Sequence, residues 1–185
     1  AMGFYPSADL HRMQRQRHDD NLLIYCVEGR GRAATDNWRG LIGPGQVLLL
    51  PQGVAHQYEA DTDDPWTIYW VHFQGTSTAV FNQYLGDREG VPPVTQAGIS
   101  PQLVAHFRGL LAVHRTGYNT RAFINAANQL RHLLTHIALE MRHAKANSQD
   151  SFNLETVQSL MLEHIGQPLD LDTLAAAAKL SKYHF

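Results

Sequence analysis

The sequence of 185 residues contains only one cysteine, Cys26, and no long run of apolar residues. A single cysteine excludes an internal disulfide, which fits a reducing compartment. No apolar run approaches the roughly 20 residues that a membrane-spanning helix needs. The first residues also lack the charged and apolar segments of a signal peptide. These absences predict a cytoplasmic protein with no membrane partner.

Clustered positive charge is lacking as well. The formal net charge is −2, and the basic residues are spread thinly apart from Arg12, Arg15 and Arg17. Because phosphate binding needs clustered positive charge, we do not expect this chain to bind nucleic acid by itself. The sequence shows neither a Ser/His/Asp constellation nor a glycine loop that would cradle phosphates. We therefore predict no enzyme activity and no cofactor.

The region from about Asn21 to Val94 has the pattern of short β-strands separated by turns. Runs that favour strands alternate with Gly/Pro turns, of which Gly43-Pro-Gly45 is the tightest. The runs cover residues 22–27, 33–36, 38–41, 47–50, 54–60 and 66–73. The run 47–50 is apolar at every position, as expected for a strand between two layers. Several short strands of this kind predict a closed barrel or jelly roll.

Two helices are predicted after the strands, over residues 101–115 and 120–145. The longer one has apolar residues at alternating steps of three and four, which form a seam. Such a seam either packs on the barrel of its own chain or forms a dimer contact, and flanking apolar residues allow both. We assign the dimer contact to Leu130, Leu134, Ile137 and Met141.

The end of the chain is predicted to be helical again. Asp170 is a good N-cap, and Leu171, Leu174 and Ala175 follow on one helical face. Ser181 offers a second N-cap after a short turn. This spacing is typical of a helix-turn-helix, whose second helix enters the DNA major groove. That second helix has barely begun at the end of the sequence, and its first DNA-binding residues would be Ser181, Lys182 and Tyr183.

Gly45, Pro51, Gly53 and His56 form a G-x5-P-x-G-x-x-H string that resembles the second conserved motif of cupin barrels. Three further sequence features occur in the same order along the chain as in a family of regulators. They are Gly29-Arg-Gly31, the Pro-Gly-Gln-Val-Leu-Leu-Leu-Pro string of residues 44–51, and Leu174-Ala175 followed by Leu180-Ser181. Over nearly its whole length the chain resembles the N-terminal portion of AraC/XylS-type transcriptional regulators.

The resemblance implies an α+β fold with three parts. Residues 1–98 would form a cupin-like effector-binding barrel with an N-terminal arm, and residues 99–147 a helical dimerisation segment. Residues 148–185 would form a linker and the truncated first part of a helix-turn-helix domain. The implied function is control of transcription by a sugar or small organic acid bound in the barrel. The partners would be a second copy of the chain and, through the full-length protein only, DNA.

In a sugar-binding member of the family, the ligand lies against an arginine, a tyrosine, a tryptophan and a histidine. By motif position, Tyr58 matches the tyrosine and Trp70 the stacking tryptophan, whereas Ile68 stands at the histidine position. The arginine matches Arg17 or Arg15. The predicted ligand-binding residues are Arg17, His56, Tyr58, Ile68, Trp70 and His72. Taken alone, these residues also allow a barrel whose rings only fill the core.

The alternative function is a cupin metalloenzyme that uses His56 and His72. A catalytic metal needs at least three protein ligands. The stretch where cupin enzymes supply more of them, residues 31–41, has no histidine and Asp36 as its one acid. We therefore predict no metal, and interpret His56 as a hydrogen-bonded residue of the pocket.

Three other features are given simple structural interpretations. His132, His136, Glu140 and His143 lie on one face of the long helix, and two histidines four residues apart can bind zinc. We interpret them as a solvated stripe. Cys26 is interpreted as a small buried hydrophobe. Residues 4–6 are expected to be a frayed terminus, the alternative being an arm that folds over a ligand.

Overall fold

A computed structural model of the chain describes residues 1–85, 92–113, 119–150, 161 and 170–177. The chain divides into two compact units, Ala1–Ala144 and Lys145–Phe185, and each is considered by itself. The strands are β1 (Met2–Tyr5), β2 (Arg12–Arg15), β3 (Asn21–Glu28), β4 (Gly31–Thr35), β5 (Arg39–Ile42), β6 (Gln46–Leu50), β7 (His56–Ala60), β8 (Thr67–Phe73) and β9 (Val94–Gln96). The helices are α1 (Thr78–Tyr84), α2 (Pro101–Ala112), α3 (Thr120–Asp150) and α5 (Leu171–Ala177).

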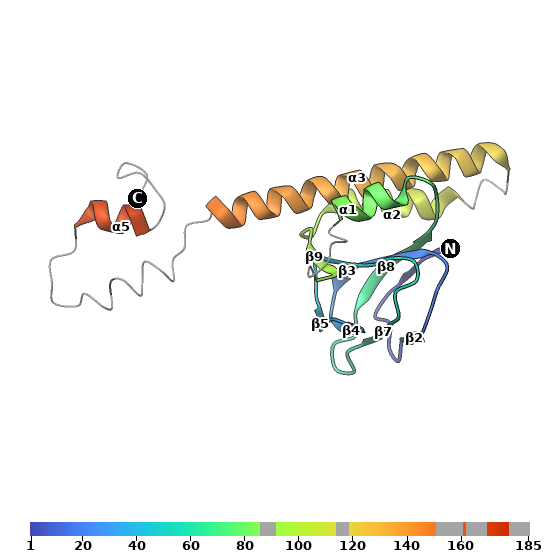
Figure 1. Cartoon of the computed structure of the whole chain (residues 1–185), viewed down its shortest axis with the longest axis horizontal. Helices are drawn as coiled ribbons and strands as arrows, with labels where there is room; N and C mark the ends of the chain where they lie inside the picture. The colour runs from blue at the N-terminus through green and yellow to red at the C-terminus, as the bar shows by residue number, and fades with distance from the viewer. Residues whose placement is uncertain (86–91, 114–118, 151–160, 162–169, 178–185) are drawn as a thin grey trace. The chain divides into compact units, whose positions relative to one another are not determined.

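The strands of the first unit form two antiparallel sheets (Figure 1). The five-stranded sheet has the order β1-β8-β3-β6-β9, and the four-stranded sheet has the order β2-β7-β4-β5. Every strand run that the sequence predicts from residue 22 to residue 73 corresponds to one of β3 to β8. The predicted fold class, α+β with a cupin-like barrel followed by helices, is confirmed.

The five-stranded sheet is a middle layer, buried on both of its faces. In β3, Leu23 and Tyr25 pack in one core with the helices, whereas Leu22 and Ile24 pack in a second core with the four-stranded sheet. Successive side chains of a strand point to opposite faces, so a continuous apolar run supplies both cores. β6 alternates in the same way, which confirms that the run 47–50 lies between two layers.

The tight turn before β6 is confirmed at Gly45. This glycine has a φ of +79°, a left-handed conformation that favours glycine. Its N–H donates to the carbonyl oxygen of Cys26 at 2.9 Å, and its own carbonyl accepts from Ala97 at 2.9 Å. The turn therefore fixes the register between β3, β6 and the segment that leads to α2.

Helices α2 and α3 cover the outer face of the five-stranded sheet. α2 begins at Pro101, where the Ser100 hydroxyl accepts the Leu103 N–H at 3.3 Å. The α3 seam packs into the same core: Leu134, Ile137 and Met141 are buried, and Leu130 is half-buried against them. The structure thus supports packing on the chain's own barrel, one of the two interpretations that the sequence allows. The dimer contact stays a prediction.

One expectation about the N-terminus is wrong. Residues 4–6 are predicted to fray, but β1 pairs with β8, with Phe4 opposite Tyr69. An edge strand gains backbone hydrogen bonds from this pairing, which no local pattern reveals. Near the other boundary, α3 continues to Asp150, past residue 148, where the sequence places the start of a linker. No glycine or proline interrupts residues 119–150, so nothing stops the helix there.

In the second unit, the predicted N-cap is confirmed. The Asp170 carboxylate accepts the Thr173 N–H at 2.7 Å, and α5 follows with Ala175 buried. Ser181, Lys182 and Tyr183 lie outside the described residues, so their DNA-binding role stays a prediction. Among the helices that the structure describes, none combines the length and apolarity needed to cross a membrane.

Candidate ligand-binding site

A cavity of about 150 Å³ lies inside the barrel, between the two sheets. It brings together four of the predicted ligand-binding residues: Tyr58 from β7 and Ile68, Trp70 and His72 from β8. The lining residues are Tyr5, His11, Met13, Arg15, Ile24, Tyr58, Ile68, Trp70 and His72. A concave space with aromatic walls and a few polar side chains has the chemistry of a small-molecule site, although this one is small.

Strand β1 closes the cavity over the indole of Trp70. The ring centroids of Tyr5 and Trp70 lie 5.7 Å apart. Gly3 lies directly against the indole, since a Cβ built on it would lie 2.5 Å from Trp70 Cζ2. Only a residue without a side chain lets the backbone pass this close. The N-terminal strand is therefore part of the wall of the site.

Unpaired polar atoms gather at this end of the barrel. Among the described residues, the buried side-chain atoms without a hydrogen-bond partner include Trp70 Nε1, His56 Nε2 and His18 Nε2. His56 stacks on Tyr58, with ring centroids 5.9 Å apart, and meets the edge of His18 at 4.5 Å. Buried polar atoms without a partner are rare, and of these three residues Trp70 lines the cavity, which favours a polar guest there.

The protonation of His56 follows from its surroundings. Its Nδ1 lies 2.9 Å from the carbonyl oxygen of Val54. Burial lowers its pKa; the hydrogen bond to Val54 opposes this, and His18, Arg15 and His72 add to the lowering. A neutral His56 that donates from Nδ1 keeps a lone pair on Nε2. His56 does not itself line the cavity; it stacks on Tyr58, which does.

Asp20 links two of the histidines. Its Oδ1 lies 2.9 Å from His72 Nδ1 and 3.2 Å from His18 Nδ1. Burial raises the pKa of Asp20, but the hydrogen bonds from His72 and His18 outweigh that effect and lower it. A carboxylate that stays ionised holds the His72 ring in one orientation at the cavity wall.

His18 and Asp20 are not among the residues predicted from the sequence. They lie between β2 and β3, in the segment that crosses from one sheet to the other. Their one signal in the sequence is the grouping Arg17-His18-Asp19-Asp20 directly before a buried strand. Such a grouping is also typical of a solvated loop, so it does not by itself indicate a site.

Arg15 is the arginine at the cavity. It lines the space and lies opposite His56 in the register of β2 and β7. Arg17 is exposed and does not line the cavity. The sequence left both arginines open, and the structure brings Arg15, but not Arg17, to the other predicted residues.

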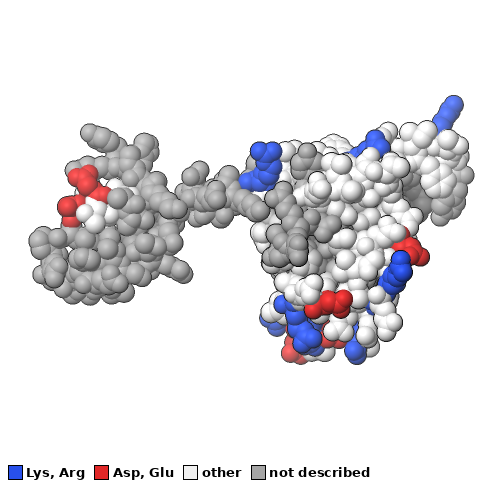
Figure 2. All heavy atoms as spheres, in the orientation of Figure 1, with Lys and Arg blue, Asp and Glu red and all other residues white. Residues whose placement is uncertain are grey.

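Two larger clefts, each of about 240 Å³, open over the four-stranded sheet, and the predicted residue His56 lines the second of them. There two arginines form ion pairs with Glu59: Arg32 Nε lies 2.6 Å from Oε1, and Arg12 Nε lies 3.6 Å from Oε2. Figure 2 shows charged side chains of both signs together at this end of the barrel. Because these charges are exposed and paired, solvated side chains account for this surface. The smaller internal cavity is therefore the better candidate site.

The metalloenzyme interpretation gains no support from the barrel. In the part of the chain that the structure describes, one group of three metal-type side chains has its ligand atoms within 4.8 Å of one another. That group does not include His56 or His72.

Cys26, which also faces the barrel interior, is fully buried, and burial raises the pKa of its thiol to about 12. Its interpretation as a buried hydrophobe is confirmed.

We expect the stability of the first unit to fall as the pH drops below 6.5. Burial lowers the pKa values of His11, His56 and His106 from this ordinary value. The unfolded chain then binds more protons than the folded one, so acid favours unfolding. Urea unfolding at pH 8.0 and pH 5.5 measures the effect, and His56→Gln should reduce the difference. Equal free energies of unfolding at both values would contradict the prediction.

Comparison with known proteins identifies a family that the chain matches and several proteins to which it is similar. The family model described as AraC-like ligand binding domain matches residues 2–162. The whole chain is 40% identical to the MmsAB operon regulatory protein of Pseudomonas aeruginosa and covers 60% of that protein. It is 34% identical over 56 residues, 30% of this chain, to the raffinose operon transcriptional regulatory protein of Pediococcus pentosaceus, of which it covers 20%. A segment of 58 residues, 28% of this chain, is 33% identical to acireductone dioxygenase of Saccharomyces cerevisiae and covers 32% of it.

Proposed function

The chain belongs to the family of AraC-like ligand-binding domains, and from this we propose that it is the effector-binding portion of a transcriptional regulator. A small molecule binds in the barrel cavity, and the full-length protein acts on DNA. The observation that carries the proposal is the cavity wall formed by Trp70, whose buried Nε1 lies beside Gly3 and has no hydrogen-bond partner among the described residues. A guest with an acceptor oxygen would supply that partner.

The cavity restricts the size and chemistry of the effector. Its volume of about 150 Å³ is small beside the roughly 300–1,000 Å³ of most ligand pockets. This favours a ligand no larger than a monosaccharide. The face of Trp70 can stack on a sugar ring or on apolar carbons, and Arg15 can pair with a carboxylate. Arg15 therefore favours a short organic acid over a neutral sugar.

Binding would control transcription by shifting an equilibrium. A ligand shifts two arrangements of a protein only by its difference in affinity for them. Tyr5 of β1 lines the cavity, so an effector that contacts this ring also acts on the pairing of β1 with β8. We propose that β1 is the element whose pairing responds to the effector.

The proposed regulator is a homodimer. The seam of Leu130, Leu134, Ile137 and Met141 is the contact that the sequence predicts. Because the last three of these side chains are buried in the chain's own core, we propose that a second copy contacts exposed apolar side chains of α3, among them Ile124 and Leu139. The α3 helix would in this way serve its own barrel and the partner on different faces.

The test is a thermal-shift screen with monosaccharides, sugar acids and short hydroxy acids. A true effector at 100 times its dissociation constant stabilises the domain by about 2.7 kcal/mol. Trp70→Ala should abolish the shift caused by the best compound, because it removes both the stacking surface and the N–H donor. Trp70→Phe keeps the ring without the donor, so a reduced shift is expected.

Size-exclusion chromatography and circular dichroism of Trp70→Ala provide the control for folding. If no compound shifts the wild-type protein, the barrel is merely a packed core. Stoichiometric iron in purified protein that is lost in His56→Gln would instead support the metalloenzyme. Unchanged binding to Trp70→Ala would place the effector outside this cavity.

A further inference from the structure

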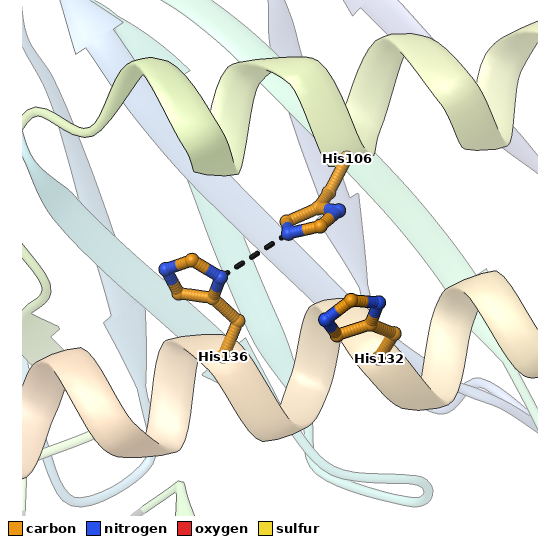
Figure 3. A group of neighbouring side chains, drawn as sticks. All are labelled: His106, His132 and His136. Carbon is orange, nitrogen blue, oxygen red and sulfur yellow. Dashed lines mark hydrogen bonds between the residues drawn. The ribbon is translucent and has the colours of Figure 1, made fainter.

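Three histidines meet between α2 and α3, on the opposite side of the five-stranded sheet from the barrel cavity. His106 comes from α2, and His132 and His136 come from α3 (Figure 3). One ligand nitrogen from each lies within 4.8 Å of the others. His106 Nε2 is 3.1 Å from His136 Nδ1, and the His106 and His132 ring centroids are 4.4 Å apart.

The core fixes the positions of these three residues. His132 and His136 are four residues apart, so they lie on the same face of α3. Each histidine directly precedes a core residue with at most 2% exposure: the three core residues are Phe107, Leu133 and Ile137. Since close packing holds these neighbours, the three Cα atoms stay at fixed distances from one another. The site is therefore built before any ligand arrives.

The nitrogen spacing suits a metal ion. Zn²⁺ binds histidine nitrogens at about 2.0–2.1 Å, which places two ligands of a tetrahedral site about 3.3 Å apart. The observed 3.1 Å between His106 and His136 is close to this distance. Small rotations of the side chains would bring in His132, which is exposed. Imidazoles are ligands that Zn²⁺, Cu²⁺ and Ni²⁺ share.

The Glu140 carboxylate lies on the side of His136 that faces away from His106. Glu140 Oε1 lies 3.3 Å from His136 Nε2. A histidine that binds a metal usually donates its other ring N–H to a carboxylate, which fixes the tautomer. With Nε2 donating to Glu140, His136 Nδ1 keeps its lone pair and faces His106.

We propose that His106, His132 and His136 bind one divalent transition-metal ion of the Zn²⁺ class, which ties α2 to α3. Glu140 orients His136, and water completes the coordination on the exposed side. The sequence interpretation of His132, His136 and Glu140 as a solvated stripe omitted His106, which is 26 residues earlier in the chain. The metal site is independent of the proposed effector, because it lies on the other face of the sheet.

The test uses tag-free protein that has been stripped with a chelator and titrated with ZnCl₂ by calorimetry. We expect one equivalent to bind. At 100 times the dissociation constant, Zn²⁺ should raise Tm by about 5–10 °C. His106→Gln and His132→Gln should each abolish this binding. Because His132 is exposed, its variant keeps the fold even if His106→Gln does not.

Three matched variants separate this site from other sources of zinc binding. Glu140→Gln should weaken binding about 10–100-fold, as expected for a residue that orients a ligand. Thr135→Ala, an exposed change on the same helix, and His56→Gln in the barrel should bind as the wild type does. Wild-type affinity in His132→Gln, or loss of binding in His56→Gln, would overturn the proposal. So would the absence of any binding to the wild-type protein.

Discussion

Replacing Leu134 by glutamate is expected to unfold the first unit, because this side chain is 2% exposed and packs in the core under α3. Loss of a buried leucine costs about 2–5 kcal/mol, and an unpaired carboxylate in an apolar site adds to that cost. A domain is stable by only about 5–15 kcal/mol, so most molecules would be unfolded. Circular dichroism and urea unfolding measure this outcome.

Leu139→Glu is the matched control on the same helix. Leu139 is 49% exposed, so its change should alter the free energy of unfolding by no more than about 0.5 kcal/mol. If Leu139 lies in a dimer contact, sedimentation of the Leu139→Glu variant would show a folded monomer. A folded, monomeric Leu134→Glu would contradict the expectation of unfolding, and would assign the predicted seam to the dimer.

Arg15→Gln is expected to weaken the tightest-binding carboxylate of the screen by about 30-fold or more. Removing one partner of a buried, hydrogen-bonded charge pair costs about 2 kcal/mol or more, and 1.4 kcal/mol is a factor of ten. Arg15 lines the cavity beside Tyr58 and opposite His56, where a bound carboxylate would have little water around it. Isothermal titration of the variant and the wild type measures the ratio.

Arg17→Gln removes the same charge two residues further along the chain. Arg17 is exposed, so solvent screens its charge and only a small change in affinity is expected. If Arg17→Gln weakens binding and Arg15→Gln does not, the arginine that the sequence put first is the ligand contact. If neither variant matters, the effector is uncharged, and a neutral sugar becomes the better candidate.

The strands could be predicted where one chain segment carries the whole pattern. Residues 22–27, 47–50 and 66–73 are long β-prone runs bounded by turn residues, and they fold as β3, β6 and β8. β1 and β2 are four residues each and have no such pattern. They are strands because β8 and β7 offer edges for them to pair with, and this depends on residues more than 40 positions away.

The candidate site was predictable only in part, for the same reason. Tyr58, Ile68, Trp70 and His72 follow from a motif and from alternation along two strands. His18 and Asp20 act on the site through the segment that joins the sheets, where no periodicity constrains a side chain. Arg15 and Arg17 share one strand parity, so alternation could not distinguish them. Arg15 lies within β2, whereas Arg17 lies beyond its end.

The sequence by itself determined what depends on near neighbours: the strand runs, the Gly45 turn, the cap at Asp170, and the apolar seam of α3. Tertiary structure decided which surfaces these elements cover and which distant side chains meet. It buried Leu134 against the sheet, and it brought His106 to within 3.1 Å of His136, 30 residues away. The reason is physical. Backbone periodicity is set by neighbouring residues, whereas the meeting of side chains that are distant in the sequence depends on how the sheets and helices pack.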